Sequence, residues 1–118
     1  EDIRIIVQIE HIDAISNLKD ILSLDEIHGS IIGPYDLSGS IGKPGDYNDN
    51  EVIDLLEEYK SISNKSNKPY GYHIILPDHQ LLLEKIEEGY TFLGFSLDTI
   101  FLGTLAREEM AKVKSFLK

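Results

Sequence analysis

Residues 3–9 read Ile-Arg-Ile-Ile-Val-Gln-Ile, a short and almost continuous run of apolar, mostly β-branched residues. Such a run is typical of a strand that is buried on both faces of a sheet. Outward from it along the chain, similar runs predict three further strands, at residues 27–32, 70–76 and 91–97. The pair Gly33-Pro34 ends the second of the four.

Each predicted strand is followed by a segment whose apolar residues lie three or four positions apart, the spacing of a helix that buries one side. We expect these helices at residues 12–22, 52–62, 77–89 and 98–118. Pro77 suits the start of the third helix and Gly89 its C-terminal cap, while Asp98 could cap the start of the fourth. Residues 33–48 are rich in Gly, Ser, Pro and Asp and are predicted to be a loop.

The order is therefore four consecutive βα units, an α/β fold with a parallel sheet and helical crossovers. Two closures remain open at this point: a small open sheet covered on both faces, or half of an eight-stranded barrel. A complete barrel takes about 250 residues, so four units should take about 125, close to the 118 residues of this chain. The chain begins Glu1-Asp2-Ile3, without an initiator Met or a signal peptide, and we expect it to be a piece of a longer protein.

Composition limits the partners that this chain can have. The 21 acidic residues outnumber the 11 basic residues and give a formal charge of −10. Because phosphates and anionic lipids would be repelled, we expect neither nucleic acid nor a membrane as a partner. The absence of cysteine excludes disulfides, thiolate metal sites and cysteine nucleophiles. We expect a cytoplasmic location, which this composition fits.

Polar side chains follow the first two predicted strands. Gln8 and Glu10 lie two positions apart, hence on one side of the first strand, and Asp36 follows the second strand. Chemistry in parallel α/β folds sits beyond the C-terminal ends of the strands, where two carboxylates repel each other unless a cation lies between them. Carboxylate oxygens favour Mg²⁺ or Mn²⁺. The competing interpretation is that Glu10 and Asp36 are solvated acids near helix starts.

Several motifs along the chain carry a family resemblance. They are Val7-Gln8-Ile9-Glu10, Gly33-Pro34-Tyr35-Asp36-Leu37-Ser38, Ile41-Gly42-Lys43-Pro44-Gly45, Lys68-Pro69-Tyr70-Gly71, and Gly89-Tyr90-Thr91-Phe92 with Asp98-Thr99. Together they resemble the HpcH/HpaI aldolase family, which are metal-dependent, class II pyruvate aldolases. The matched part is the second half of the family's (βα)₈ TIM barrel. The resemblance implies that residues 1–118 are a half-barrel, strands five to eight, ending in a C-terminal helix.

The resemblance also implies roles for individual residues. Glu10 and Asp36 would bind a divalent metal ion, Mg²⁺ or Mn²⁺ with Co²⁺ as a further option, and Gln8 would contact the substrate beside it. The backbone N–H groups of Tyr35 and Asp36 would hold the carboxylate of pyruvate. The family places a small residue where Tyr35 stands, so this side chain would narrow the mouth or add a hydroxyl. The implied reaction is reversible cleavage of a 4-hydroxy-2-oxo acid to pyruvate and an aldehyde through a metal-stabilised enolate.

Other catalytic groups of the family are not assigned in this chain. The family's general base, a His paired with an Asp, and its enolate-stabilising Arg belong to the first half of the barrel, so the fragment alone is expected to be inactive. His73 is interpreted as a core or rim histidine within the third strand, and His11 as the exposed start of a helix. The lysines lie in loops or on helix faces, which disfavours Schiff-base chemistry.

The expected partners are a small-molecule 2-oxo acid and an aldehyde, the missing half-barrel within the same protein, and further copies in a homo-oligomer. Two alternatives remain open. One is a lyase like the β subunit of citrate lyase, acting on acyl-CoA thioesters, although CoA phosphates need a basic groove and this chain is acidic. The other is a non-catalytic half-barrel that self-assembles through unpaired strand edges and an apolar inner face.

Overall fold

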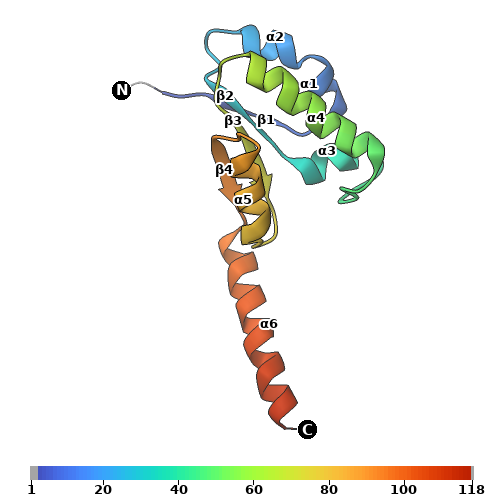
Figure 1. The fold of residues 1–118 in the computed structure, drawn as a ribbon, viewed down its shortest axis with the longest axis vertical. Coiled ribbons are helices and arrows are strands. Elements are labelled where there is room, and N and C mark those ends of the chain that lie inside the picture. The colour runs from blue at the N-terminus through green and yellow to red at the C-terminus, as the bar shows by residue number, and fades with distance from the viewer. Residues whose placement is uncertain (1–2, 118) are drawn as a thin grey trace.

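The computed structural model describes residues 3–117 as a four-stranded parallel sheet with helical crossovers (Figure 1). The strands are β1 (Ile6–Ile9), β2 (Gly29–Ile32), β3 (Tyr70–Ile74) and β4 (Phe92–Phe95). They pair in the order β1-β2-β3-β4, and each strand is parallel to its neighbour. This confirms the predicted α/β class with four βα units. In a doubly wound sheet the strand order reverses at one point. The order here does not reverse, so it is the strand order of a barrel.

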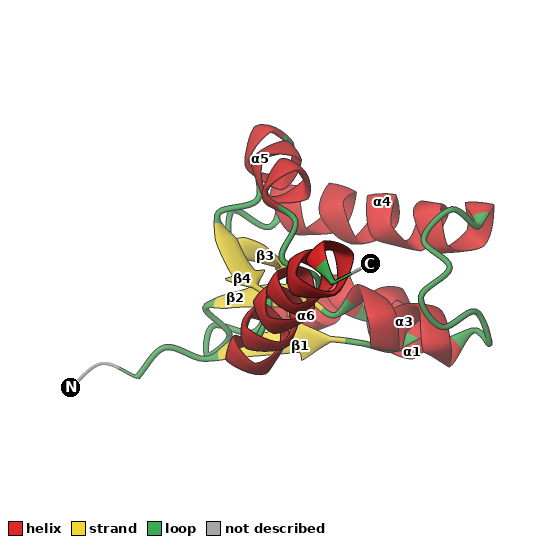
Figure 2. Ribbon diagram, turned by 90° about the horizontal axis from the view of Figure 1, so that it is seen from below, coloured by secondary structure: helices red, strands yellow, loops and turns green. Residues whose placement is uncertain are grey.

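Within residues 3–117, six helices connect and follow the strands. They are α1 (Ile12–Ser16), α2 (Leu18–Ser23), α3 (Pro34–Ser40), α4 (Asn50–Lys65), α5 (His79–Glu87) and α6 (Asp98–Phe116). Figure 2 shows α4 and α5 along one side of the strands. Within residues 3–117, the search for a helix with the length and apolar character of a membrane span finds none.

The hydrophobic core lies between the sheet and the helices, because alternate residues of each strand face that side. Ile9 of β1, Ile32 of β2 and Ile74 of β3 are each at most 1% exposed. Buried side chains of the helices pack against them, among them Ile15, Leu18, Leu22, Leu37, Leu55 and Tyr59.

One buried hydroxyl ties α4 to the sheet. The Tyr59 hydroxyl lies 2.9 Å from the Ser30 hydroxyl and donates to the carbonyl oxygen of Gly71 at 3.1 Å. Tyr59 is fully buried, and burial is the main cause that raises its pKa, so the phenol stays protonated. The bond between β2, β3 and α4 thus satisfies polar groups that would otherwise be buried without partners.

The opposite side of the sheet is open, which corrects the expectation that the first strand is buried on both faces. Ile6 of β1 is 38% exposed, Phe92 of β4 is 44% exposed, and Gln8 is also exposed. β1 and β4 are the edges of the sheet, and no element of residues 3–117 covers this side. We refer to it as the inner face, because it would face the interior of a closed barrel.

The predicted elements differ from the observed ones in four places. The helix expected over residues 12–22 breaks at Asn17 into α1 and α2. The expected loop at residues 33–48 begins with helix α3, which has Pro34 in its first turn, a position that proline favours. Pro77 precedes α5 without starting it, since Asp78 is the N-cap and accepts bonds from the N–H groups of Gln80 and Leu81.

The fourth difference is α6, which extends away from the rest of the molecule (Figure 1). The sequence predicted an apolar side that faces the core, yet none of its residues is buried. The radius of gyration is 17.2 Å, against about 13.5 Å for a compact domain of this length. Asp98 is the first residue of α6, and Leu97 is its N-cap. Lys118, the predicted end of this helix, lies outside the described residues.

Candidate metal and substrate site

Glu10 and Gln8 form the part of the site that β1 supplies. They lie on the inner face, and the Gln8 amide donates to the Glu10 carboxylate at 2.5 Å. β1 and β2 are in register so that Ile9 faces Ile32, which brings Glu10 beside Gly33. A Cβ atom at Gly33 would lie 2.9 Å from the Glu10 Oε1 atom and 3.0 Å from its Cγ atom. Any side chain at position 33 would therefore collide with Glu10, and a glycine there leaves room for the carboxylate.

Tyr35 and Asp36 lie in the first turn of α3, directly after β2. Gly33 is the N-cap of this helix and offers no side-chain acceptor to the N–H groups that follow. The first N–H groups of a helix have no partner within the helix, so those of Tyr35 and Asp36 are available to an anion. Both side chains are exposed. Glu10 and Asp36 thus lie at the C-terminal ends of neighbouring strands, as predicted.

The loop after α3 is tied to this helix and to the next one. The Ser38 hydroxyl donates to the carbonyl oxygen of Tyr35 at 2.7 Å and accepts from the N–H of Gly45 at 2.9 Å. Lys43 donates to Asp49 at 2.7 Å and to Glu51 at 2.8 Å. These bonds to the two carboxylates raise the pKa of Lys43, and the bond from Lys43 lowers the pKa of Asp49.

The Tyr35 ring lies against this loop. A Cβ atom at Gly45 would come within 3.3 Å of the ring, and Gly45 has a φ of 76°, a backbone region that favours glycine. Tyr47, on the same loop, lies near both predicted site residues of α3. Burial, followed by the neighbouring Tyr35 and Asp36, raises the pKa of Tyr47.

The residues present fit a divalent cation in the chemistry of their donors. Glu10 and Asp36 supply carboxylate oxygens, which hard cations prefer, and two protein ligands would leave positions for water and substrate. Within residues 3–117, no cluster of three or more His, Cys, Asp or Glu side chains is suited to hold a metal ion. The predicted pair contains only two such side chains, so a complete coordination shell would need oxygens from substrate, water or other parts of the protein.

The two histidines near the site have different surroundings. The His11 Nδ1 atom accepts from the N–H of Asp13 at 3.1 Å and caps α1, which confirms the interpretation as an exposed helix start. His73 is half-buried on the inner face, opposite Gly94 of β4. A Cβ atom at Gly94 would lie 3.0 Å from the His73 ring, so the glycine makes room for the imidazole.

Sequence reasoning missed three residues that shape this site. Gly33 was interpreted only as the end of a strand. A glycine directly after a strand can also indicate that another group lies close to the backbone there, and here that group is the Glu10 carboxylate. Lys43 was interpreted as a loop lysine, and nothing in the sequence pairs it with Asp49 and Glu51. Tyr47 lies in a segment that was predicted to be a loop, and the fold of this loop brings it near Tyr35 and Asp36.

A parallel sheet in barrel order, with carboxylates at the C-terminal ends of adjacent strands, defines this chain as part of a barrel-type α/β protein. A family model described as HpcH/HpaI aldolase/citrate lyase matches residues 1–102. The chain therefore belongs to the HpcH/HpaI aldolase/citrate lyase family, as the sequence motifs indicated.

Individual relatives agree with this assignment. The chain is 31% identical to a hydroxypyruvate/pyruvate aldolase of Sagittula stellata over 95% of its length. It is 30% identical to a 2-keto-3-deoxy-L-rhamnonate aldolase of Escherichia coli O6:K15:H31 over 94% of its length. The crystal structure of an HpcH/HpaI aldolase from Desulfitobacterium hafniense DCB-2 superposes with a TM-score of 0.87 at 26% identity, over 95% of this chain and 43% of that one.

The chain spans less than half of the curated relatives that it matches, 44% of the first and 41% of the second. Their remaining residues have no counterpart in these 118.

Proposed function

We propose that the protein to which this chain contributes is an aldolase that cleaves 4-hydroxy-2-oxo acids reversibly to pyruvate and an aldehyde. The observation that carries the proposal is the placement of Glu10, which Gln8 holds over Gly33 at the start of α3. This puts one carboxylate beside Gly33, the N-cap of the helix whose first turn carries the second carboxylate, that of Asp36. Membership of an aldolase/lyase family supports the same chemistry.

Each residue of the site has a defined task in this proposal. Glu10 and Asp36 would hold a divalent ion, which supplies Lewis-acid polarisation of the 2-oxo group when bound. The N–H groups of Tyr35 and Asp36 bind the carboxylate of the oxo acid, and their orientation is fixed by α3 before the substrate arrives. Gln8 keeps the Glu10 carboxylate turned toward the mouth and offers its amide to the substrate.

The proposal extends to the parts that this chain does not contain. We place the general base, a His paired with an Asp, and an arginine in a first half-barrel of the same protein, so that residues 1–118 alone are inactive. That half is the intramolecular partner of the inner face. We further propose a homo-oligomer in the cytoplasm, with Mg²⁺, Mn²⁺ or Co²⁺ as the ion and no nucleic-acid or membrane partner.

The substrate class follows from what the relatives are named for. One acts on hydroxypyruvate or pyruvate and another on 2-keto-3-deoxy-L-rhamnonate, and both names contain a 2-oxo acid. We propose that this part of the substrate is shared and that the aldehyde differs. The side chain of Tyr35 is exposed and would meet the aldehyde, whereas its N–H would bind the carboxylate.

Exchange of the methyl protons of pyruvate with deuterium tests the metal and carboxylate roles directly. In the full-length protein with added Mg²⁺ or Mn²⁺, Glu10→Gln and Asp36→Asn should each slow the exchange by at least about 10²-fold, since loss of a ligand to a Lewis acid removes several kcal/mol of stabilisation. Glu26→Gln, which removes an exposed carboxylate just before the N-terminal end of β2, the opposite end from the site, should leave the rate unchanged. Exchange at the normal rate in both site variants would contradict the proposal.

The family name also includes citrate lyase, so a reaction on acyl-CoA thioesters is the second candidate. The two reactions are separated by assaying a 4-hydroxy-2-oxo acid and a citryl thioester with the same enzyme preparation. Turnover of the thioester alone would replace the aldolase proposal.

A further inference from the structure

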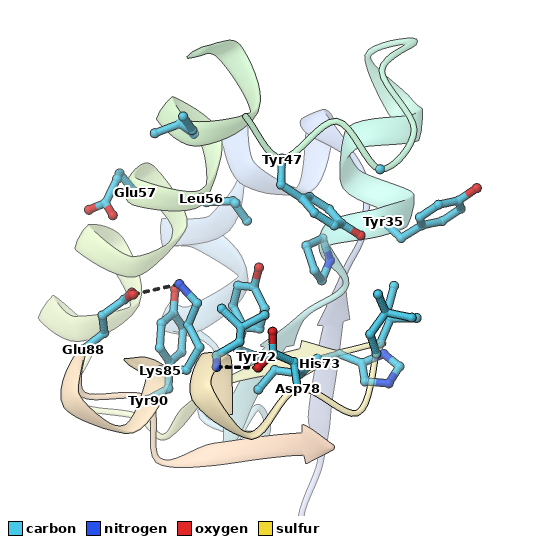
Figure 3. Close-up of a pocket in the computed structure, with 17 residues that line it drawn as sticks. Tyr35, Tyr47, Leu56, Glu57, Tyr72, His73, Asp78, Lys85, Glu88 and Tyr90 are labelled. Atoms are coloured by element: carbon cyan, nitrogen blue, oxygen red, sulfur yellow. Dashed lines mark hydrogen bonds and ion pairs between the residues drawn. The ribbon is translucent and has the colours of Figure 1, made fainter. Parts of the chain in front are cut away.

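A cavity of about 610 Å³ lies between α4, α5 and the C-terminal end of β3 (Figure 3). Its volume falls in the range of small-molecule sites, about 300–1,000 Å³. Gln8, Glu10 and Asp36 do not line it, and Gln8 lies on the opposite, inner face of the sheet. Tyr35, Tyr47 and His73 line the cavity and also lie near the candidate metal site. The cavity therefore borders that site, but its lining contains none of the proposed metal ligands.

The walls of the cavity are mainly apolar. α4 contributes Ile53 and Leu56, α5 contributes Leu81, and the end of β3 contributes Ile74 and Leu76. Leu76 is 67% exposed and Ile53 is 41% exposed, so part of this apolar wall is in contact with solvent. A ligand with an apolar body would remove that surface from water, which favours binding in proportion to the area covered.

Two buried tyrosines line the cavity and have unused hydrogen-bonding capacity. Tyr72 is 6% exposed and Tyr90 is 5% exposed, and their rings contact at 5.4 Å between centroids. Within residues 3–117 neither hydroxyl forms a hydrogen bond, whereas that of Tyr59 bonds to Ser30 and Gly71. Burial raises the pKa of Tyr72 to about 12 and also raises that of Tyr90. Both hydroxyls are therefore donors at neutral pH.

The charges around the cavity disfavour an ionic ligand. Glu57, Asp78 and Glu88 line it with a single ammonium group, that of Lys85. This ammonium is bonded to Glu88 at 2.7 Å and lies 4.9 Å from the Tyr72 ring centroid and 5.9 Å from that of Tyr90 (Figure 3). Lys60, outside the lining, lies 3.7 Å from Glu57 and 3.4 Å from Glu88, so an anion would meet three carboxylates and two ammonium groups, still an excess of negative charge. A cation would compete with Lys85 for the aromatic faces that cations prefer.

We propose that this cavity binds an uncharged molecule that has an apolar body and a carbonyl oxygen, with Tyr72 and Tyr90 as the donors to that oxygen. Lys85 then serves as a fixed cation that holds the two rings and excludes a second positive charge. The site does not depend on the proposed aldolase function, because it uses none of the carboxylates assigned to the metal.

Three probes of nearly the same shape separate the possible ligand charges. They are 4-phenylbutan-2-one, which is neutral, 3-phenylpropanoate, which is anionic, and 4-phenylbutan-2-amine, which is cationic. Calorimetric titration of the full-length protein should show the ketone binding at least about tenfold more tightly than either charged analogue. Equal affinity for all three, tighter binding of a charged probe, or no binding of the ketone would overturn the proposal.

Variants locate the binding and separate it from the metal site. Tyr72→Phe and Tyr90→Phe should each weaken binding of the ketone by about three- to tenfold, the usual effect of one lost hydrogen bond. Tyr70→Phe is the matched control, because Tyr70 lies on the same strand but outside the cavity lining. Glu10→Gln should leave the affinity for the ketone unchanged. Ketone binding that is unaffected by both cavity variants, or that is lost with Glu10→Gln, would contradict the assignment.

Discussion

The two faces of the sheet carry similar residues but differ in what covers them. On the helix side, Ile9, Ile32 and Ile74 are at most 1% exposed beneath helices that the same chain supplies. On the inner face, Ile6 and Phe92 are 38% and 44% exposed. Helix α6, which extends away from the sheet, also has an uncovered apolar side, with Phe116 89% exposed. An apolar stretch of sequence therefore predicts that its side chains need to be buried. The helices that connect the strands bury these side chains on one face of the sheet only.

This difference has a functional side as well. Gln8 and Glu10 of the candidate metal site lie on the open face, whereas the side that is packed by helices carries the core and the buried Tyr72 and Tyr90 of the cavity. In barrel proteins the interior is filled by side chains from all strands, so four strands can supply only part of the interior. Residues on the helix side should therefore determine stability in this chain, and residues on the inner face should determine activity in the whole protein.

The largest expected effect is on the packed side. Ile32→Ala removes a side chain that is fully buried and should lower the free energy of unfolding by about 2–5 kcal/mol. Leu102→Ala on α6 removes a side chain that is 71% exposed and should change it by less than about 0.5 kcal/mol. Urea denaturation of the 118-residue chain measures both. A similar loss in the two variants would mean that α6 packs in solution.

A smaller effect is expected where the inner face meets α3. Gly33→Ala places a Cβ atom 2.9 Å from the Glu10 Oε1 atom, and this flexible carboxylate can move away at little cost in stability. Displacement of a positioned group by about 1 Å can reduce the rate by about 10²-fold, so activity should fall while the fold remains. Gly39→Ala is the control, because its nearest contact is 3.9 Å away. Pyruvate proton exchange and urea denaturation, run in parallel, give the two readings.

Next in size is the buried bond between α4 and the sheet. Tyr59→Phe leaves the Ser30 hydroxyl and the Gly71 carbonyl without their partner and should cost about 1–3 kcal/mol of stability. Tyr35→Phe, at a side chain that is 49% exposed, should cost much less. If thermal or urea unfolding shows equal losses for the two variants, the buried hydroxyl has found another partner.

The smallest effect is expected from the partly exposed ion pairs of Lys43 with Asp49 and Glu51. The pKa of Asp49 is lowered and that of Lys43 is raised. The stabilisation of the folded state by Asp49 is fully present at pH values above its unfolded pKa, near 3.9. It is lost as the pH falls through the lower pKa of the folded state. The stabilisation by Lys43 is fully present at pH values below its unfolded pKa of about 10.4. It is lost as the pH rises through the higher pKa of the folded state.

The stability difference between wild type and Lys43→Met should therefore be greatest between about pH 4 and pH 10 and vanish toward both ends. High salt should reduce it as well, since exposed pairs are screened. Chemical denaturation across this pH range measures the difference, and Lys65→Met, near the end of α4, is a control of the same type. A difference that grows below pH 4 would show that the lysine acts through something other than its carboxylate partners.

Much of the fold was determined by sequence. Short, mostly β-branched apolar runs predicted all four strands, and apolar residues spaced three or four positions apart predicted most helices. The position of Glu10 after β1 and of Asp36 after β2 followed from the same reasoning, since parallel strands end at one edge. The motifs added the family, which the match over residues 1–102 confirms.

Other features were decided by tertiary contacts. Helix α3 forms in a segment rich in Gly and Ser because Pro34 starts it and Leu37 is buried against the core. The room for Glu10 above Gly33 exists only once β1 and β2 are paired in register, and Tyr47 comes near Tyr35 and Asp36 only once its loop is folded. The sequence by itself determined which residues must be buried and where polar groups follow strands, because these depend on neighbours along the chain. Which apolar surfaces find cover, and which side chains meet, depends on distances between segments far apart in sequence, and only the folded chain sets those.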